Sequence, residues 1–168
     1  MLLVLRLLHI ASGVFWAGGS IFAARFIMPA LKAAGPAAGP VMAELGKRGI
    51  PVAMMGAALV NVASGIWLMV IDASGAPGVF MQSTTRRTLA LGGGLAILAV
   101  LLGVTVGMPM QRRMGQITAA AQKRGGPPSP DEAAELQRLG QRSGTLGVVA
   151  AVLLFLATAA MATARYMP

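Results

Sequence analysis

Four long apolar runs, separated by charged or Pro- and Gly-rich connections, dominate the sequence. They are residues 2–28, 51–71, 88–108 and 144–164. Each has about the 20 apolar residues that an α-helix needs to cross the hydrocarbon core of a bilayer. Because backbone polar groups in hydrocarbon must be satisfied internally, such runs fold as helices. We therefore expect an all-α integral membrane protein, a four-helix transmembrane bundle that forms one membrane domain over residues 1–168.

The composition agrees with this class and excludes several kinds of site. Hydrophobic residues make up 56% of the chain and charged residues 11%, whereas soluble domains carry about a quarter charged residues. The chain has no cysteine, which excludes disulfides, thiolate zinc sites and iron–sulfur clusters. The net charge of +9 resides largely in the connections, where Lys and Arg set topology and bind lipid headgroups. We expect membrane lipids, and no nucleic acid, as partners of these residues.

The distribution of Lys and Arg predicts the orientation of the bundle. The first and third connections hold nine of these residues, whereas the second connection and the C-terminus hold only Arg86, Arg87 and Arg165. Because cytoplasmic loops are enriched in Lys and Arg, we expect periplasmic termini, a cytoplasmic basic loop at residues 110–143, and a bacterial inner membrane location. Within that loop, Ser129 followed by proline and acidic residues predicts the start of a helix leading into the fourth run.

Small and polar residues within the runs predict how the helices pack. In lipid, helices associate through small residues that let their backbones approach closely. The pattern Gly103-x-x-x-Gly107 in the third run is of this kind. Asn61 lies near the middle of the second run and is expected to form a hydrogen bond between helices. Trp16 lies in the middle of the first run and is expected to pack inside the bundle.

The first run contains His9, the only histidine of the chain. It lies about 10 Å along the helix from the start of the run. The imidazole therefore either forms hydrogen bonds near the membrane–water interface or belongs to a functional site within the bundle. Antiparallel neighbours bring further residues to a similar depth: Met69, Met161, Gly92, Gly93 and Gly94. Histidine with methionine is an axial pair for haem iron, and three glycines leave room for a macrocycle. These residues therefore define a possible haem b site, with His9 and either methionine as axial ligands.

Twelve methionines offer another ligand chemistry. Met54-Met55 and Met108-x-Met110-x-x-x-Met114 are the densest clusters, and thioethers suit Cu(I), although methionine is also an adaptable core filler. The runs contain no carboxylate pair, and the chain has no Ser–His–Asp order and no phosphate-binding loop. An enzyme built on this chain would need a cofactor, and we assign no catalytic residue.

The first run resembles that of a family of membrane proteins. The residues that carry the resemblance are Leu8-His9-Ile10, Phe15-Trp16-Ala17-Gly18-Gly19 and Arg25-Phe26-Ile27-Met28-Pro29. They are similar to the first span of the superfamily of small four-helix membrane proteins that includes the CopD copper-resistance domain and HemJ-type protoporphyrinogen oxidase. The resemblance extends more weakly over Pro51–Met69, and it implies a four-helix bundle. In the HemJ branch the histidine that matches His9 would bind haem, whereas a second histidine is absent here.

These observations lead to one expected function and two alternatives. The leading expectation is a small, non-enzymatic inner-membrane protein that serves as a subunit or accessory of a larger membrane complex. The first alternative is a haem b protein in electron transfer or porphyrin oxidation. The second alternative is a component of copper or small-solute transport.

Overall fold

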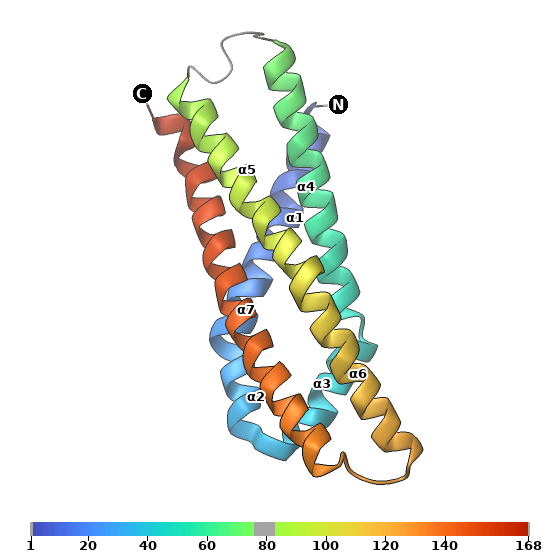
Figure 1. The fold of residues 1–168 in the computed structure, drawn as a ribbon. Helices are drawn as coiled ribbons and strands as arrows, with labels where there is room; N and C mark the ends of the chain where they lie inside the picture. The colour runs from blue at the N-terminus through green and yellow to red at the C-terminus, as the bar shows by residue number, and fades with distance from the viewer. Residues whose placement is uncertain (1, 76–82, 168) are drawn as a thin grey trace.

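The computed structural model describes residues 2–75 and 83–167, and the described chain is almost entirely helical. Four long helical segments are each long and apolar enough to cross a membrane (Figure 1). These segments are Leu2–Ala34, Ile50–Ser74, Thr84–Lys123 and Pro130–Tyr166. The all-α fold is confirmed, and the arrangement is consistent with a multi-pass membrane protein.

Two of the four segments continue through the proline that directly follows their apolar run, Pro29 and Pro109. The first consists of α1 (Leu2–Phe22), the π-helix η1 (Ala23–Ile27) and α2 (Met28–Ala34). The third consists of α5 (Thr84–Leu102), the π-helix η4 (Gly103–Gly107) and α6 (Met108–Lys123). A proline inside a helix has no N–H to donate, and its ring crowds the preceding turn. In both segments a wider π turn precedes the Met-Pro pair, so the helix continues instead of ending.

The remaining elements also extend beyond the expected runs. The 3₁₀ turn η2 (Gly35–Ala37) leads into the short helix α3 (Ala38–Lys47), and α4 (Ile50–Ser74) follows. The last segment is α7 (Pro130–Thr163), which ends in the 3₁₀ turn η5 (Ala164–Tyr166). The expected loop at residues 110–143 is therefore helical except at residues 124–129. Part of the second connection, residues 76–82, lies outside the described residues.

The helices form two antiparallel hairpins that pack side by side. α1 packs along α4, α5 packs along α7, and α1 joins the hairpins through its contact with α7. Contact between α4 and α5 is much less extensive than contact within either hairpin. Both chain ends lie at one end of the bundle, and the connection between α6 and α7 lies at the other (Figure 1).

The buried core is small and lies halfway along the apolar part of the bundle. Eighteen residues without a formal charge separate Arg6 from Arg25, about 27 Å of helix, and Trp16 lies at their centre. Ala99 and Leu154 lie at or next to the centres of the third and fourth apolar runs, residues 88–108 and 144–164. All three belong to one buried cluster that consists mainly of alanines. Small side chains therefore bring the four helices together near the expected bilayer midplane.

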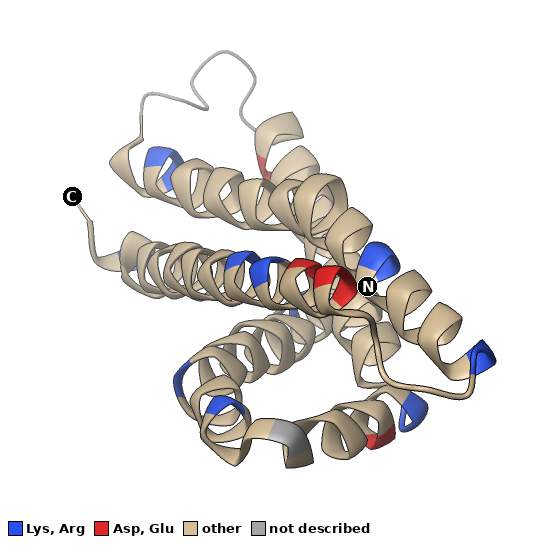
Figure 2. Cartoon of the chain, turned by 60° about the horizontal axis from the view of Figure 1, so that its bottom comes forward, with Lys and Arg blue, Asp and Glu red and all other residues tan. Residues whose placement is uncertain are grey.

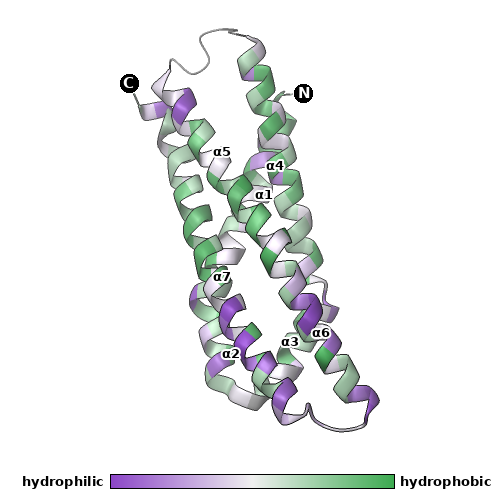
Figure 3. Ribbon diagram, viewed as in Figure 1, coloured by the Kyte–Doolittle hydropathy of each residue, from purple (hydrophilic) through white to green (hydrophobic). Residues whose placement is uncertain are grey.

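Polar residues gather at the end of the bundle opposite the termini. Figure 3 shows hydrophobic colouring over most of the bundle and hydrophilic colouring on α6 and the start of α7. Figure 2 shows Lys, Arg, Asp and Glu side by side at this end. α7 has 34 residues, about 51 Å of helix, which exceeds the thickness of about 30 Å of a hydrocarbon core. Its first turns therefore project beyond the apolar layer.

Candidate functional site

A pair of reciprocal hydrogen bonds connects His9 on α1 with Asn61 on α4. The side-chain Nδ2 of Asn61 donates to the backbone oxygen of His9 at 2.8 Å. In return, Nδ1 of His9 lies 2.9 Å from the backbone oxygen of Asn61. A carbonyl oxygen only accepts, so this bond requires a proton on Nδ1. The expected interhelical hydrogen bond of Asn61 is confirmed, and it selects one tautomer of the histidine.

Glycines on both helices make this close approach possible. A methyl carbon on Gly13 would lie 2.7 Å from Nδ2 of Asn61, and one on Gly65 would lie 2.8 Å from Cε1 of His9. Any larger residue at either position would collide with the partner side chain. The hydroxyl of Ser64 lies 3.3 Å from Nδ1 of His9 and donates to the backbone oxygen of Val60. The site is thus a polar cluster held between two apolar helices.

The second nitrogen of the imidazole remains available. Among the described residues, the polar contacts of the His9 ring all involve Nδ1, and no enclosed side-chain nitrogen or oxygen lacks a partner. Nε2 is therefore accessible from outside the protein and has a lone pair. A histidine that donates its other N–H to a carbonyl has the arrangement typical of metal-ligating histidines. Nε2 can accept a hydrogen bond or bind a metal.

Among the other residues of the possible haem site, Gly92 and Met161 pack against each other. Gly92 on α5 packs against α7, where the backbone oxygen of Ala157 and Cγ of Met161 would each lie 3.0 Å from an added methyl carbon. Met161 thus packs against Gly92. Met69 lies one turn beyond Gly65 on α4, the glycine that faces the His9 ring. Gly93 and Gly94 face open space. α7 therefore already occupies the space beside Gly92.

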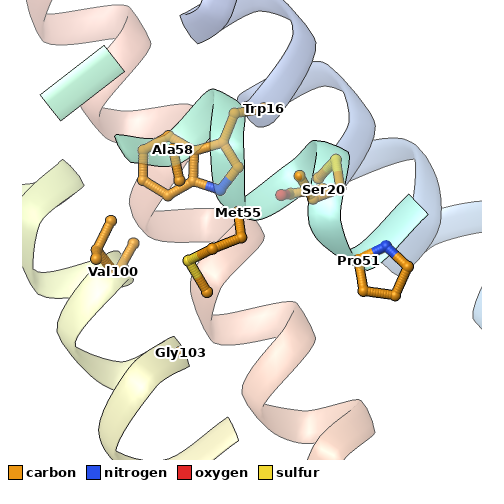
Figure 4. Close-up of a pocket in the computed structure, with 9 residues that line it drawn as sticks. Trp16, Ser20, Pro51, Met55, Ala58, Val100 and Gly103 are labelled. Carbon is orange, nitrogen blue, oxygen red and sulfur yellow. The ribbon is translucent and has the colours of Figure 1, made fainter. Parts of the chain in front are cut away.

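A cavity of about 210 Å³ lies near the buried cluster and was not predicted from the sequence (Figure 4). Its lining comes from α1, α4, α5 and the first residue of η4: Trp16, Ser20, Pro51, Met54, Met55, Ala58, Ala99, Val100 and Gly103. Trp16 is 8% exposed, which confirms that it packs inside the bundle. Met54 and Met55, considered above as Cu(I) ligands, are thus neighbours of an indole. The sequence signal was the spacing of Trp16 and Ser20, which places both on one face of α1.

Ion pairs connect α6 with the start of α7 at the polar end. Arg113 donates to both carboxylate oxygens of Glu135, at 2.7 and 3.0 Å, and Arg124 pairs with Glu132. Ser129 and Glu132 form a capping box, which confirms the predicted helix start. The backbone N–H of Ser129, with Arg124, lowers the pKa of Glu132. The hydrogen bond from Arg113 lowers the pKa of Glu135, and that carboxylate raises the pKa of Arg113.

Within the described ranges, no group of three or more His, Cys, Asp or Glu side chains could hold a metal ion. Comparisons of the chain with protein-family models, with curated proteins and with solved structures found no match. The inferences about function below therefore start from the residues and their geometry.

Proposed function

We propose that this chain is a non-enzymatic subunit of a larger membrane assembly, located in a bacterial inner membrane with both termini in the periplasm. The observation that carries the proposal is a set of helix glycines beside which no other described element packs. Glycine in a helix costs about 1 kcal/mol relative to alanine. When no element of the same chain packs against a helix glycine, close packing against a helix of another protein best explains why glycine is present there.

The glycines of the bundle fall into two groups. Those of the first group pack tightly inside the chain, as Gly13, Gly65 and Gly92 do. Those of the second group, in the four long helical segments, have no heavy atom of another described element within 4 Å of an added methyl carbon: Gly18, Gly56, Gly93, Gly94, Gly103, Gly115, Gly140, Gly144 and Gly147. Gly140, Gly144 and Gly147 recur at the spacing of one face of α7. We name these three residues the α7 glycine face and assign it to a partner helix.

The experiment replaces part of the α7 glycine face with a larger residue. The double variant Gly144→Leu/Gly147→Leu should fold as the wild type does, because both positions have open space. It should lose a stoichiometric partner that co-purifies with the wild-type chain from its native membranes in mild detergent. Val152→Leu, at an exposed position of the same helix, is the matched control. A wild-type chain that purifies alone, or a partner that the double variant retains, contradicts the proposal.

The free Nε2 of His9 favours haem b binding as a second candidate function. His9 would be one axial ligand, and the second would come from Met69 or from a partner subunit. Haem would supply one-electron chemistry, while this chain would contribute the imidazole and its tautomer. The complex purified from native membranes should then have a Soret band that His9→Ala removes and Ser12→Ala retains. A colourless, stoichiometric complex would leave only the structural role.

A further inference from the structure

We propose that the cavity beside Trp16 binds the ring of a neutral, lipid-soluble carbonyl compound of the quinone class. The first observation is the indole N–H of Trp16. It makes no hydrogen bond to any described residue, although the side chain is 92% buried. Because no enclosed nitrogen in the described chain lacks a partner, this N–H must face accessible space. Figure 4 shows the indole nitrogen on the side of the ring toward Met55, across the cavity.

Ser20 provides an independent observation. Serine and threonine hydroxyls inside these helices typically donate to the backbone oxygen one turn earlier, as in Ser12 to Leu8 at 2.6 Å and Thr105 to Leu101 at 2.7 Å. Ser20 lines the cavity and makes no such bond within the described chain. An unsatisfied polar group in hydrocarbon is costly. Two such groups in one apolar cavity indicate a ligand with hydrogen-bond-accepting oxygen atoms.

The walls of the cavity define the rest of the ligand. Its lining has no charged side chain, so the ligand is neutral. Met54 and Met55 present thioethers, which pack favourably against rings. An engineered cavity of about 150 Å³ in another protein binds benzene, so about 210 Å³ accommodates one substituted ring. The ring of a quinone combines these properties: it is flat, neutral and has two carbonyl oxygens.

The depth of the indole favours this ligand over an ordinary phospholipid, and the cavity extends from the indole toward Pro51, the first residue of the second apolar run. Trp16 lies halfway between Arg6 and Arg25, at the expected midplane, about 15 Å from either edge of the hydrocarbon core. Ester carbonyls of glycerolipids lie near those edges and do not reach the indole. A ligand that diffuses within the bilayer can enter between α4 and α5, the pair of neighbouring helices with limited contact. The indole end of the binding site is therefore reached from the membrane interior.

Quenching of tryptophan fluorescence tests the proposal, because the chain has two tryptophans in different settings. Trp67 is 59% exposed and lies outside the cavity. The Trp67→Phe variant leaves Trp16 as the fluorophore, and Trp16→Phe leaves Trp67. Duroquinone, a tetramethylated benzoquinone, is titrated into each purified variant at constant detergent. Quenching of Trp16 should saturate, whereas quenching of Trp67 should rise linearly.

Further variants test the chemistry of the site. In the Trp67→Phe background, Ser20→Ala should raise the duroquinone concentration needed for half-maximal quenching by about three- to tenfold. Ser12→Ala should leave that concentration unchanged. Durene, which has the same methylated ring without carbonyls, should compete at least tenfold less well than duroquinone. Linear quenching of Trp16 overturns the site, and equal competition by durene overturns the ligand class. The measurement uses the isolated chain, so either failure leaves the subunit role to be judged by its own experiment.

Discussion

Replacing Gly65 with alanine tests whether the contact between His9 and α4 holds the first hairpin together. The added methyl carbon would lie 2.8 Å from Cε1 of His9, well inside the 3.5–4.0 Å at which carbons pack. The imidazole would have to move and break its 2.9 Å bond to the backbone oxygen of Asn61. Overpacking costs about 1–3 kcal/mol, and a hydrogen bond between membrane helices contributes about 0.6–1.7 kcal/mol.

Alanine also gains about 0.5–1 kcal/mol over glycine from helix propensity. The net change in the free energy of unfolding should therefore be a loss of about 1–4 kcal/mol. Gly18→Ala is the matched control, since no heavy atom lies within 4 Å of its added carbon. It should stabilise the protein by about 0.5–1 kcal/mol. Both changes are measured by reversible unfolding in mixed detergent micelles, followed by far-UV circular dichroism.

The same substitution in a His9→Ala background provides the decisive comparison. Without the imidazole, the methyl group of Gly65→Ala meets open space, and the substitution should become stabilising, as at Gly18. This reversal of sign measures the coupling between the two positions directly. The reasoning is refuted if Gly65→Ala stabilises the wild-type protein as much as Gly18→Ala does. It is also refuted if the loss of stability persists after removal of the imidazole.

Three other predictions concern the polar groups. Asn61→Leu removes the donor to the backbone of His9 and should lower the free energy of unfolding in detergent by about 0.6–1.7 kcal/mol. Ser129→Ala removes the cap of α7 and should cost about 1 kcal/mol, measured by denaturant titration. The pKa values of Glu132 and Glu135 are lowered by their partners. Their ion pairs therefore stabilise the contact between α6 and α7 fully above the ordinary pKa of 4.5, and this stabilisation is lost as pH falls below that value. A spin-label distance between α6 and α7 should therefore broaden at low pH, and Glu135→Gln should broaden it at neutral pH; a distance distribution unchanged in both cases would contradict this prediction.

Much of the helical architecture could be predicted from the order of residues alone. Apolar runs of bilayer length form helices because hydrocarbon leaves their backbone groups no other partner. The burial of Trp16, the interhelical bond of Asn61 and the helix start at Ser129 were also predicted, since each depends on depth or on neighbours in sequence. The expected runs stop just before Pro29 and Pro109, residues whose missing N–H disfavours a helix interior, whereas the π turns beside them let both helices continue.

The tertiary structure decided which residues at similar depth meet. His9, Met161 and Gly92 were expected at similar heights, but depth leaves the rotation of each helix about its axis undetermined. Close packing at Gly65 turns His9 toward Asn61, and packing at Gly92 joins α5 to Met161 on α7. The cavity beside Trp16 likewise exists because α4 and α5 make only limited contact. Sequence therefore determined the helices and their depth, whereas side-chain packing determined their rotation and the location of the candidate sites.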